Sequence, residues 1–391
     1  MSAFFKKTLW PCYATTFLLF ALIFLWGISG SLGGGGATYR GFSFHILIPI
    51  IVSLGGLVLG FQNAYAKHLY PLFSAGLTFF MFHLLFDSPI FSRTLVISLL
   101  LPLCAAFAGL GLGAALRKIR LLRQIALGLF VIAALLMLVH IVHAATFDRI
   151  IEYNEISFSS PNLPSEMNGY RIAFITDPHT ISEARLLDVV KKLNRQSLDL
   201  LLLGGDFATS TAWMRQTIEI LAQVETTDGI FGVEGNHDNH IHLFAAMEEN
   251  GMTPLSNSGL HIREGFFLAG VEDLWNRNPS IAHAIEGAQT DDFILLLSHN
   301  PDVSMQEDTS RVNLILSGHT HGGQITFFGI WAPYFSLTRH LTAYGQRFRD
   351  GWAESRDGTP VFVSRGLGEY MPRVFARPEV TLLTLHSETL P

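Results

Sequence analysis

The sequence feature that most constrains the fold is a set of polar clusters, each placed at the end of a short apolar run. The runs, at 172–176, 200–203, 230–233, 294–297 and 314–316, have the length and composition of buried strands. The clusters that follow them are Asp177-Pro178-His179, Gly204-Gly205-Asp206, Gly235-Asn236-His237-Asp238, Ser298-His299-Asn300 and Gly318-His319-Thr320-His321. A strand that ends abruptly delivers its next side chain to the rim of a sheet. The clusters therefore predict one polar site on a rigid scaffold.

Seven side chains in these clusters are candidate metal ligands: Asp177, His179, Asp206, Asn236, His299, His319 and His321. A single tetrahedral zinc ion takes three or four ligands, so seven donors suffice for two ions. Oxygen and imidazole donors without cysteine favour Mn, Fe, Zn or Co over an all-oxygen magnesium site, and we expect manganese first. Two ions about 3.5–4 Å apart form the clamp that phosphoryl hydrolysis uses.

The order D-x-H, G-D, G-N-H-D, H and G-H-x-H resembles the calcineurin-like metallophosphoesterase superfamily, from about Asn162 to the C terminus. Further motifs, at 167–172, 268–273, 297–302 and 363–368, are similar to a membrane-associated, bacterial-type branch that includes some UDP-2,3-diacylglucosamine pyrophosphatases. The resemblance implies a metal-dependent phosphoric ester hydrolase. It also implies an α/β (α+β) fold with two mixed sheets packed as a sandwich and flanked by helices, which the alternation of strand and helix patterns favours as well.

Carried over position by position, the resemblance implies two sets of ligands bridged by Asp206. One ion would be held by Asp177, His179 and His321, and the other by Asn236, His299 and His319. His237 would be the catalytic general acid, because a histidine titrates near neutrality and can protonate a leaving oxygen. The chain departs from the family at Thr209, where a second aspartate often orients that acid, and at Pro178, which replaces an apolar residue.

Each cluster taken alone has a plainer interpretation. Asp-Pro is a turn signal, Gly-Gly-Asp is common where a strand passes into a helix, and two histidines can simply lie at a surface. Their joint order favours a metal site. A site that binds metal or a phosphorylated ligand without turnover stays open as an alternative.

Composition divides the chain near residue 146. Residues 1–146 are mostly apolar with a net charge of +8, whereas residues 147–391 carry −14. Candidate membrane spans, each of about 17–25 residues, lie at 9–28, 44–61, 70–86, 95–116 and 125–145. We therefore expect an all-α transmembrane region of about five helices at 1–146, a linker at 147–160 and a catalytic domain at 161–391. The acidic charge of that domain disfavours nucleic acid as a partner.

The basic residues predict the orientation of these spans. With the N terminus inside, seven lysines and arginines fall in inner loops and two in outer loops. Five spans then place the catalytic domain on the extracytoplasmic side of the cell membrane. Omitting the shortest span, 70–86, would reverse this orientation. An extracytoplasmic domain conflicts with UDP-diacylglucosamine as substrate, since that lipid is made on the cytoplasmic leaflet.

The sequence thus predicts a multi-pass membrane phosphoesterase with two divalent ions. Its substrate would be a phosphomonoester or pyrophosphate, amphiphilic or lipid-linked, and its other partner the bilayer. The alternatives are a UDP-2,3-diacylglucosamine pyrophosphatase of lipid A synthesis, and a non-catalytic membrane sensor or transporter whose soluble domain binds a phosphorylated ligand. His140 and His143, one helical turn apart near the end of the last span, are interpreted as interfacial residues rather than as a metal pair.

Overall fold

Residues 119–391 are described by the computed structural model, apart from 180, 208–209, 333–334, 336–340, 369–372 and 389–391. The chain forms two compact units, residues 1–142 and residues 143–391. Four of the expected spans and Thr209 therefore lie outside the described residues.

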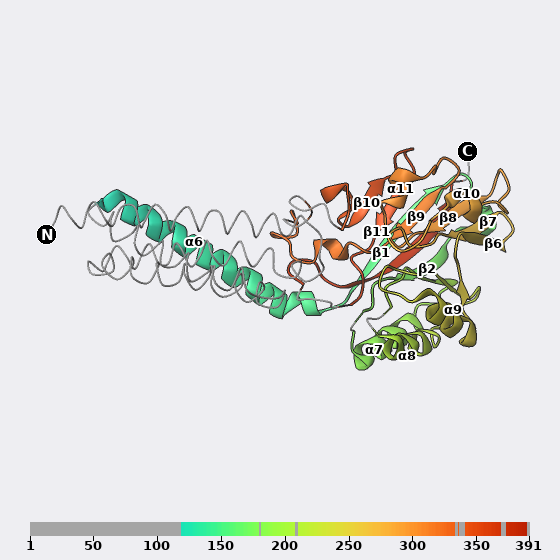
Figure 1. Cartoon of the computed structure of the whole chain (residues 1–391), viewed down its shortest axis with the longest axis horizontal. Coiled ribbons are helices and arrows are strands. Elements are labelled where there is room, and N and C mark those ends of the chain that lie inside the picture. The colour runs from blue at the N-terminus through green and yellow to red at the C-terminus, as the bar shows by residue number, and fades with distance from the viewer. Residues whose placement is uncertain are drawn as a thin grey trace, which may run out of the picture. The chain divides into compact units, whose positions relative to one another are not determined.

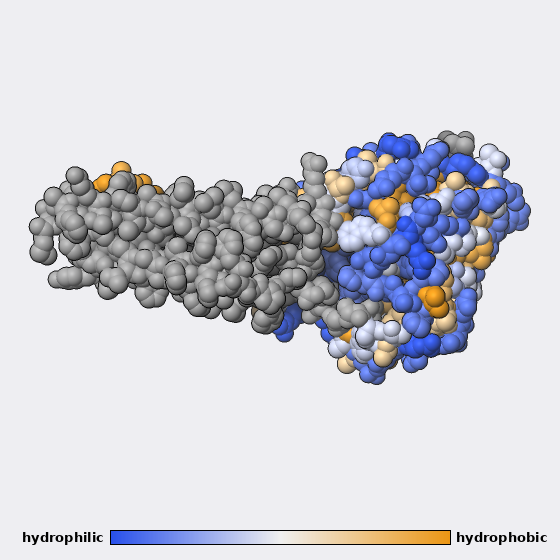
Figure 2. Space-filling model, viewed as in Figure 1, coloured by the Kyte–Doolittle hydropathy of each residue, from blue (hydrophilic) through white to orange (hydrophobic). Residues whose placement is uncertain are grey.

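Helix α6 (Arg120–Ala145) contains the remaining expected span, 125–145. It exposes apolar side chains along its length, and Leu121, Leu135 and Leu138 are each more than half exposed. In Figure 2 the visible part of this helix is hydrophobic, whereas the visible face of unit 143–391 is largely hydrophilic. Across the part of the chain that the structure describes, no helix reaches the length and hydropathy required to cross a membrane.

Two mixed sheets form the framework of unit 143–391 (Figure 1). The first has the order β1-β12-β2-β3-β4-β5, with β1 (Glu152–Ser160), β12 (Glu379–Ser387), β2 (Tyr170–Ile175), β3 (Leu200–Leu203), β4 (Ile230–Gly232) and β5 (Thr253–Pro254). The second has the order β10-β11-β9-β8-β7-β6, with β10 (Gly351–Glu354), β11 (Pro360–Val363), β9 (Leu314–Ser317), β8 (Phe293–Leu297), β7 (Phe266–Gly270) and β6 (Ser258–Arg263). Pairing is parallel from β2 to β5 and from β7 through β8 and β9 to β11. The expected sandwich of two mixed sheets is confirmed.

Alternation along the central strands creates three apolar layers. In β2, Ile172 and Phe174 face the second sheet, and in β3 Leu202 does the same. The intervening residues Ala173 and Leu201 face the opposite side, because successive side chains of a strand point to opposite faces. There they meet α7 (Glu183–Leu193), α8 (Thr211–Leu221) and α9 (His240–Glu249), while α10 (Ile281–Ala284) and α11 (Val303–Gln306) flank the outer face of the second sheet.

The segment expected as a linker, 147–160, is part of the folded unit. It contains a short 3-10 helix, η3 (Phe147–Arg149), and the edge strand β1, which pairs in parallel with β12. Tyr153 packs against the core under the helices, whereas Ile156 and Phe158 pack against the core between the sheets. The first sheet therefore begins before residue 161, because β1 has a half-buried alternation that suits an edge strand.

We predict that the core between the sheets dominates the stability of this unit. Leu202 is fully buried there, so Leu202→Ala should lower the free energy of unfolding by about 2–5 kcal/mol. The matched control is Leu187→Ala on α7, where the side chain is 39% exposed and the expected change is within about 0.5 kcal/mol. Chemical denaturation of the full-length protein measures both, and equal losses would contradict this account of the core.

Candidate metal centre

The candidate ligands lie where parallel strands of both sheets end. Asp177 follows β2, Asp206 follows β3 and Asn236 follows β4 in the first sheet. His299 follows β8 and His319 follows β9 in the second sheet. Carboxyl ends of parallel strands meet at one edge, so the two sheets present their polar side chains to the same site.

Asp177, His179 and His321 form the first cluster, in which all three are buried. The Nε2 atoms of His179 and His321 lie 3.2 Å apart. Oδ1 of Asp177 lies 3.3 Å from Nε2 of His321 and 3.7 Å from Nε2 of His179. Oδ2 of Asp177 accepts hydrogen bonds from the Thr176 hydroxyl and from the His319 N–H, at 2.7 and 2.9 Å. One carboxylate oxygen therefore fixes the loops, and the other faces two imidazole nitrogens.

Asp206, His299 and His319 form the second cluster, which is also buried. Nδ1 of His299 lies 2.7 Å from the Gly204 carbonyl oxygen, and Nε2 of His319 lies 3.0 Å from the Leu341 carbonyl oxygen. If these nitrogens carry the protons, the second nitrogen of each ring has its lone pair free for a cation. These second nitrogens, Nε2 of His299 and Nδ1 of His319, lie 3.2 Å apart. The Asn236 Oδ1 atom lies 3.2 Å from Nε2 of His299.

The Asp206 carboxylate lies between the clusters. Its Oδ2 is 3.5 Å from Nε2 of His179 and 3.4 Å from Nε2 of His299. Its Oδ1 accepts the main-chain N–H of His237 at 2.7 Å. The structure thus brings together all seven ligands predicted from the sequence, and Asp206 contacts both groups.

These donors fit divalent cations. Metal–ligand distances of about 2.0–2.1 Å place neighbouring donors about 3.0–3.4 Å apart, close to the separations in both clusters. Asp177 Oδ1 and His321 Nδ1 are buried and have no hydrogen-bond partner among the described residues. A buried carboxylate oxygen in that state is costly unless a cation neutralises it, so the first cluster is better suited to a metal than to a protein donor.

Electrostatics keeps most of these rings neutral. Burial lowers the pKa of His179, and burial together with nearby His179 and Arg373 lowers the pKa of His321. Burial also lowers the pKa of His319 to about 3. Burial opposes a charge on His299 as well, but the neighbouring Asp206 carboxylate outweighs it and raises that pKa. Neutral imidazole is the form that binds a metal, so three of the rings are ready for one.

The backbone around the site is strained in a consistent way. Five candidate ligands have positive φ angles: Asp177 (53°), His179 (41°), Asp206 (57°), His319 (69°) and His321 (52°). Left-handed backbone is unusual for residues other than glycine and clusters at functional sites. Gly235 is required for a different reason, which is space: a Cβ atom there would lie 2.3 Å from Oδ1 of Asp206.

Two residues that the sequence did not single out hold these loops. Asp238 accepts the main-chain N–H groups of Asp206, Phe207 and Gly235, at 2.7–2.9 Å. Arg373 is buried and donates to backbone carbonyl oxygens, including those of Gly368 and Ala376, and to that of His321 at 3.4 Å. Asp238 was visible in the Gly-Asn-His-Asp motif, but nothing in the sequence marked Arg373.

The loop at 271–280, which connects β7 to α10, covers part of the site. Asp273 accepts the main-chain N–H groups of Trp275 and Asn276, which shapes the loop. The Trp275 ring meets the His319 ring edge to face, with centroids 4.5 Å apart. The Asn276 side chain donates to the Asn236 carbonyl oxygen at 2.6 Å. The loop therefore supports the second cluster from outside.

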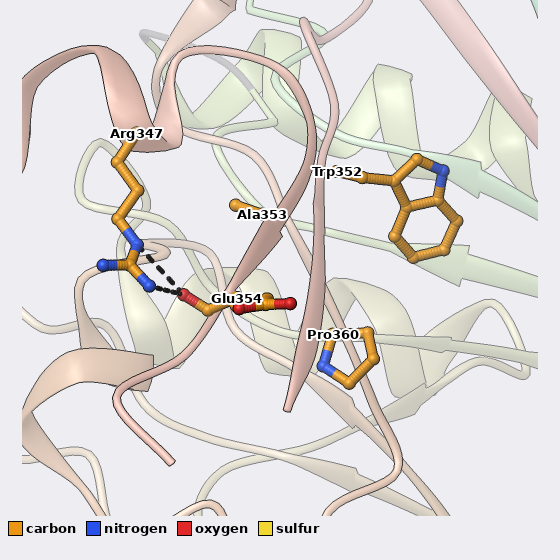
Figure 3. Close-up of a pocket in the computed structure, with 5 residues that line it drawn as sticks. All are labelled: Arg347, Trp352, Ala353, Glu354 and Pro360. Atoms are coloured by element: carbon orange, nitrogen blue, oxygen red, sulfur yellow. Dashed lines mark hydrogen bonds between the residues drawn. The ribbon is translucent and has the colours of Figure 1, made fainter. Parts of the chain in front are cut away.

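A cavity of about 500 Å³ lies elsewhere, beside edge strand β10 (Figure 3). It is lined by Arg347, Trp352, Ala353, Glu354 and Pro360. The Arg347 guanidinium donates to the Glu354 carbonyl oxygen at 3.1 and 2.8 Å. Since no candidate ligand lines this cavity, we assign it no part in the metal chemistry.

Known proteins share the segment that contains the site. The sequence model of the calcineurin-like phosphoesterase family matches residues 170–323, a range that includes both clusters and His237. The chain is 30% identical over 258 residues to the uncharacterized metallophosphoesterase YkuE of Bacillus subtilis, covering 61% of this chain and 87% of that protein.

Two further relatives have more descriptive names. A zebrafish (Danio rerio) protein called transmembrane protein with metallophosphoesterase domain is 28% identical over 288 residues, covering 67% of this chain and 63% of that protein. The phosphodiesterase YaeI of Escherichia coli is 28% identical over 236 residues, covering 55% of this chain and 82% of that protein. This chain therefore spans slightly less than two thirds of the zebrafish protein.

We predict different metal losses for the two aspartates of the site. Asp177→Asn should weaken one ion site, whereas Asp206→Asn should weaken two, each by at least about 100-fold, since loss of even a partner of a ligand costs about 10–100-fold. Titration calorimetry and elemental analysis of the full-length protein measure affinity and stoichiometry. The control is Asp188→Asn, an exposed aspartate on α7. If the Asp206→Asn protein retained two tightly bound ions, Asp206 could not be a ligand that both ions share.

Proposed function

The chain belongs to the calcineurin-like phosphoesterase family and is a metal-dependent hydrolase, and we propose that it acts at a membrane. The proposed reaction is hydrolysis of a phosphomonoester or pyrophosphate bond in an amphiphilic or lipid-linked substrate. The resemblance to the superfamily seen in the sequence is confirmed. The names of the relatives given above do not mention UDP-diacylglucosamine, so that substrate stays a prediction.

The observation that carries this proposal is the pair of buried clusters joined by Asp206. Asp177, His179 and His321 would hold one ion, Asn236, His299 and His319 the other, and Asp206 both. When bound, the ions would supply positive charge for the phosphoryl oxygens and lower the pKa of a water molecule. The nitrogen and oxygen donor set favours Mn, with Fe, Zn or Co as further candidates.

His237 is the proposed proton donor. Its ring is exposed, and its centroid lies 5.5 Å from that of His179. Its main chain is fixed by Asp206, so its position relative to the clusters is set by a proposed ligand. An imidazole that is close to the ligands but reaches solvent can give its ring proton to a leaving oxygen and regain one from water.

Membrane attachment is supported by the sequence and by the relatives' names. Residues 1–146 are mostly apolar, α6 exposes leucine side chains, and the zebrafish relative is called a transmembrane protein. The excess of basic residues in alternate loops favours an extracytoplasmic catalytic domain. We therefore propose a multi-pass protein of the cell membrane.

The role of His237 predicts a dependence on the leaving group. His237→Ala should keep its metals and lose about 10²–10⁴-fold in turnover of an alkyl phosphate, the usual contribution of general acid catalysis. The loss should be far smaller with p-nitrophenyl phosphate, because a stable phenolate needs little protonation. Steady-state kinetics with both substrates and elemental analysis test this, with the exposed His242→Ala on α9 as control. Equal losses on both substrates, accompanied by metal release, would instead make His237 a ligand.

The charge distribution predicts the side on which the C terminus lies. Alkaline phosphatase fused after Pro391 should be active in a bacterial host, and green fluorescent protein fused there should be dark, because each reports its compartment. The reverse pair of results would place the catalytic domain in the cytoplasm and reinstate a substrate of the inner leaflet.

A further inference from the structure

Residues 325–331, here called the aromatic hairpin, present apolar side chains to solvent. Phe327 and Trp331 are 41% and 42% exposed, and Ile330 is 78% exposed. The hairpin is held in place: Phe327 donates its N–H to the Trp331 carbonyl oxygen at 2.7 Å, and Arg349 donates to the Ile330 carbonyl oxygen at 2.6 Å. Ordered exposure of large apolar side chains is typical of a binding surface.

The aromatic hairpin is joined to the end of α6 by a row of rings. Phe328 lies 5.1 Å from Phe375, and Phe375 stacks on His143 at 3.7 Å. His143 also lies 2.7 Å from Oδ2 of Asp148, which in turn accepts the Phe375 N–H. The apolar surface continues onto Phe147, which is 55% exposed. Ring contacts thus connect the aromatic hairpin, through Phe375, to His143 and Phe147 at the C-terminal end of α6.

Basic side chains stand beside this surface. The Arg185 side chain donates to the Arg149 carbonyl oxygen at 2.7 Å, and that of Arg377 donates to the Ile150 carbonyl oxygen at 3.4 Å. Arg149 itself is exposed. Exposed aromatic and apolar groups with flanking arginines match the chemistry of a bilayer interface that contains anionic lipids.

The same surface is rigidly linked to the metal centre. Only Gly322, Gly323 and Gln324 separate His321 from the aromatic hairpin. Arg373 also donates to the carbonyl oxygen of His321 and to that of Ala376, which follows the Phe375 that contacts the hairpin. A surface held against the bilayer would therefore hold the first cluster at a fixed height above it.

We propose that the aromatic hairpin, with Phe147 and Ile150, rests in the headgroup layer of the membrane. The occupant is a lipid surface because α6 ends beside the hairpin and the chain before it, residues 1–146, is largely apolar. The site then takes phosphate esters that are embedded in the bilayer rather than dissolved in water. This assignment of substrate class rests on the function proposed above, whereas the lipid contact can be tested without it.

The first test measures lipid contact in the full-length protein. Cys12 and Cys104 are replaced by serine, and a fluorescent probe is attached at Ile330→Cys or, as control, at Ile241→Cys on α9. These isoleucines are 78% and 74% exposed, and α9 packs with α7 and α8 on the face of the first sheet that is turned away from the second sheet. In vesicles of phosphatidylcholine and phosphatidylglycerol, spin-labelled lipid should quench the probe at 330 and spare the probe at 241. Equal quenching at both positions, or none at 330, would overturn the proposal.

The second test uses activity. Ile330→Asp should lower turnover of a long-chain alkyl phosphate in the same vesicles by about tenfold, the effect expected from loss of one buried apolar side chain, and leave hydrolysis of soluble p-nitrophenyl phosphate unchanged. Ile241→Asp should change neither. An equal loss on both substrates would mean a structural role and contradict the proposal. If the wild type hydrolyses neither substrate, the proposed function fails, and quenching alone then decides whether the hairpin contacts lipid.

Discussion

The rest of the site depends on the contacts that the Asp206 carboxylate makes with both clusters and with His237. One oxygen holds the main chain of His237, and the other lies about midway between His179 and His299, at 3.5 and 3.4 Å. Removing this buried charge from water is unfavourable, so it needs cations or charged rings around it. The same requirement explains why candidate ligands from both sheets converge on it. A single carboxylate thus sets the spacing of the two clusters and the position of the proposed acid.

The fold meets this requirement by placing strained loops on rigid strands. Five candidate ligands have left-handed backbone, and at one of them, Asp206, the Asp238 carboxylate accepts the main-chain N–H together with those of Phe207 and Gly235. Beneath the loops, the two sheets pack fully buried side chains against each other, such as Phe174 of the first sheet and Leu295 of the second. Relaxing any one loop would move donors that must stay within a few tenths of an ångström of their places. Stability of the sandwich and geometry of the site are therefore coupled.

Local patterns in the sequence predicted the strand ends and the residues that meet there. An apolar run followed by Asp, His or Asn is visible without any knowledge of tertiary structure, and β3 was predicted to the residue. The sequence predicts a linker where the structure has strand β1, because the partner of β1, β12, lies more than 200 residues away in the chain. Arg373 and the aromatic hairpin were missed for the same reason. Their roles depend on contacts between segments that are distant in sequence, and single residues such as arginine or isoleucine carry no signal of them.

The most direct test of the shared carboxylate is electron paramagnetic resonance of the full-length protein loaded with two equivalents of Mn²⁺. Two ions bridged by Asp206 should be magnetically coupled and give the broad, multi-line spectrum of an exchange-coupled pair. Such coupling requires the two ions to lie about 3.5–4 Å apart, and its loss in Asp206→Asn would assign it to the carboxylate rather than to a bridging water. A simple six-line spectrum of isolated Mn²⁺, at full occupancy of both sites, would contradict the account.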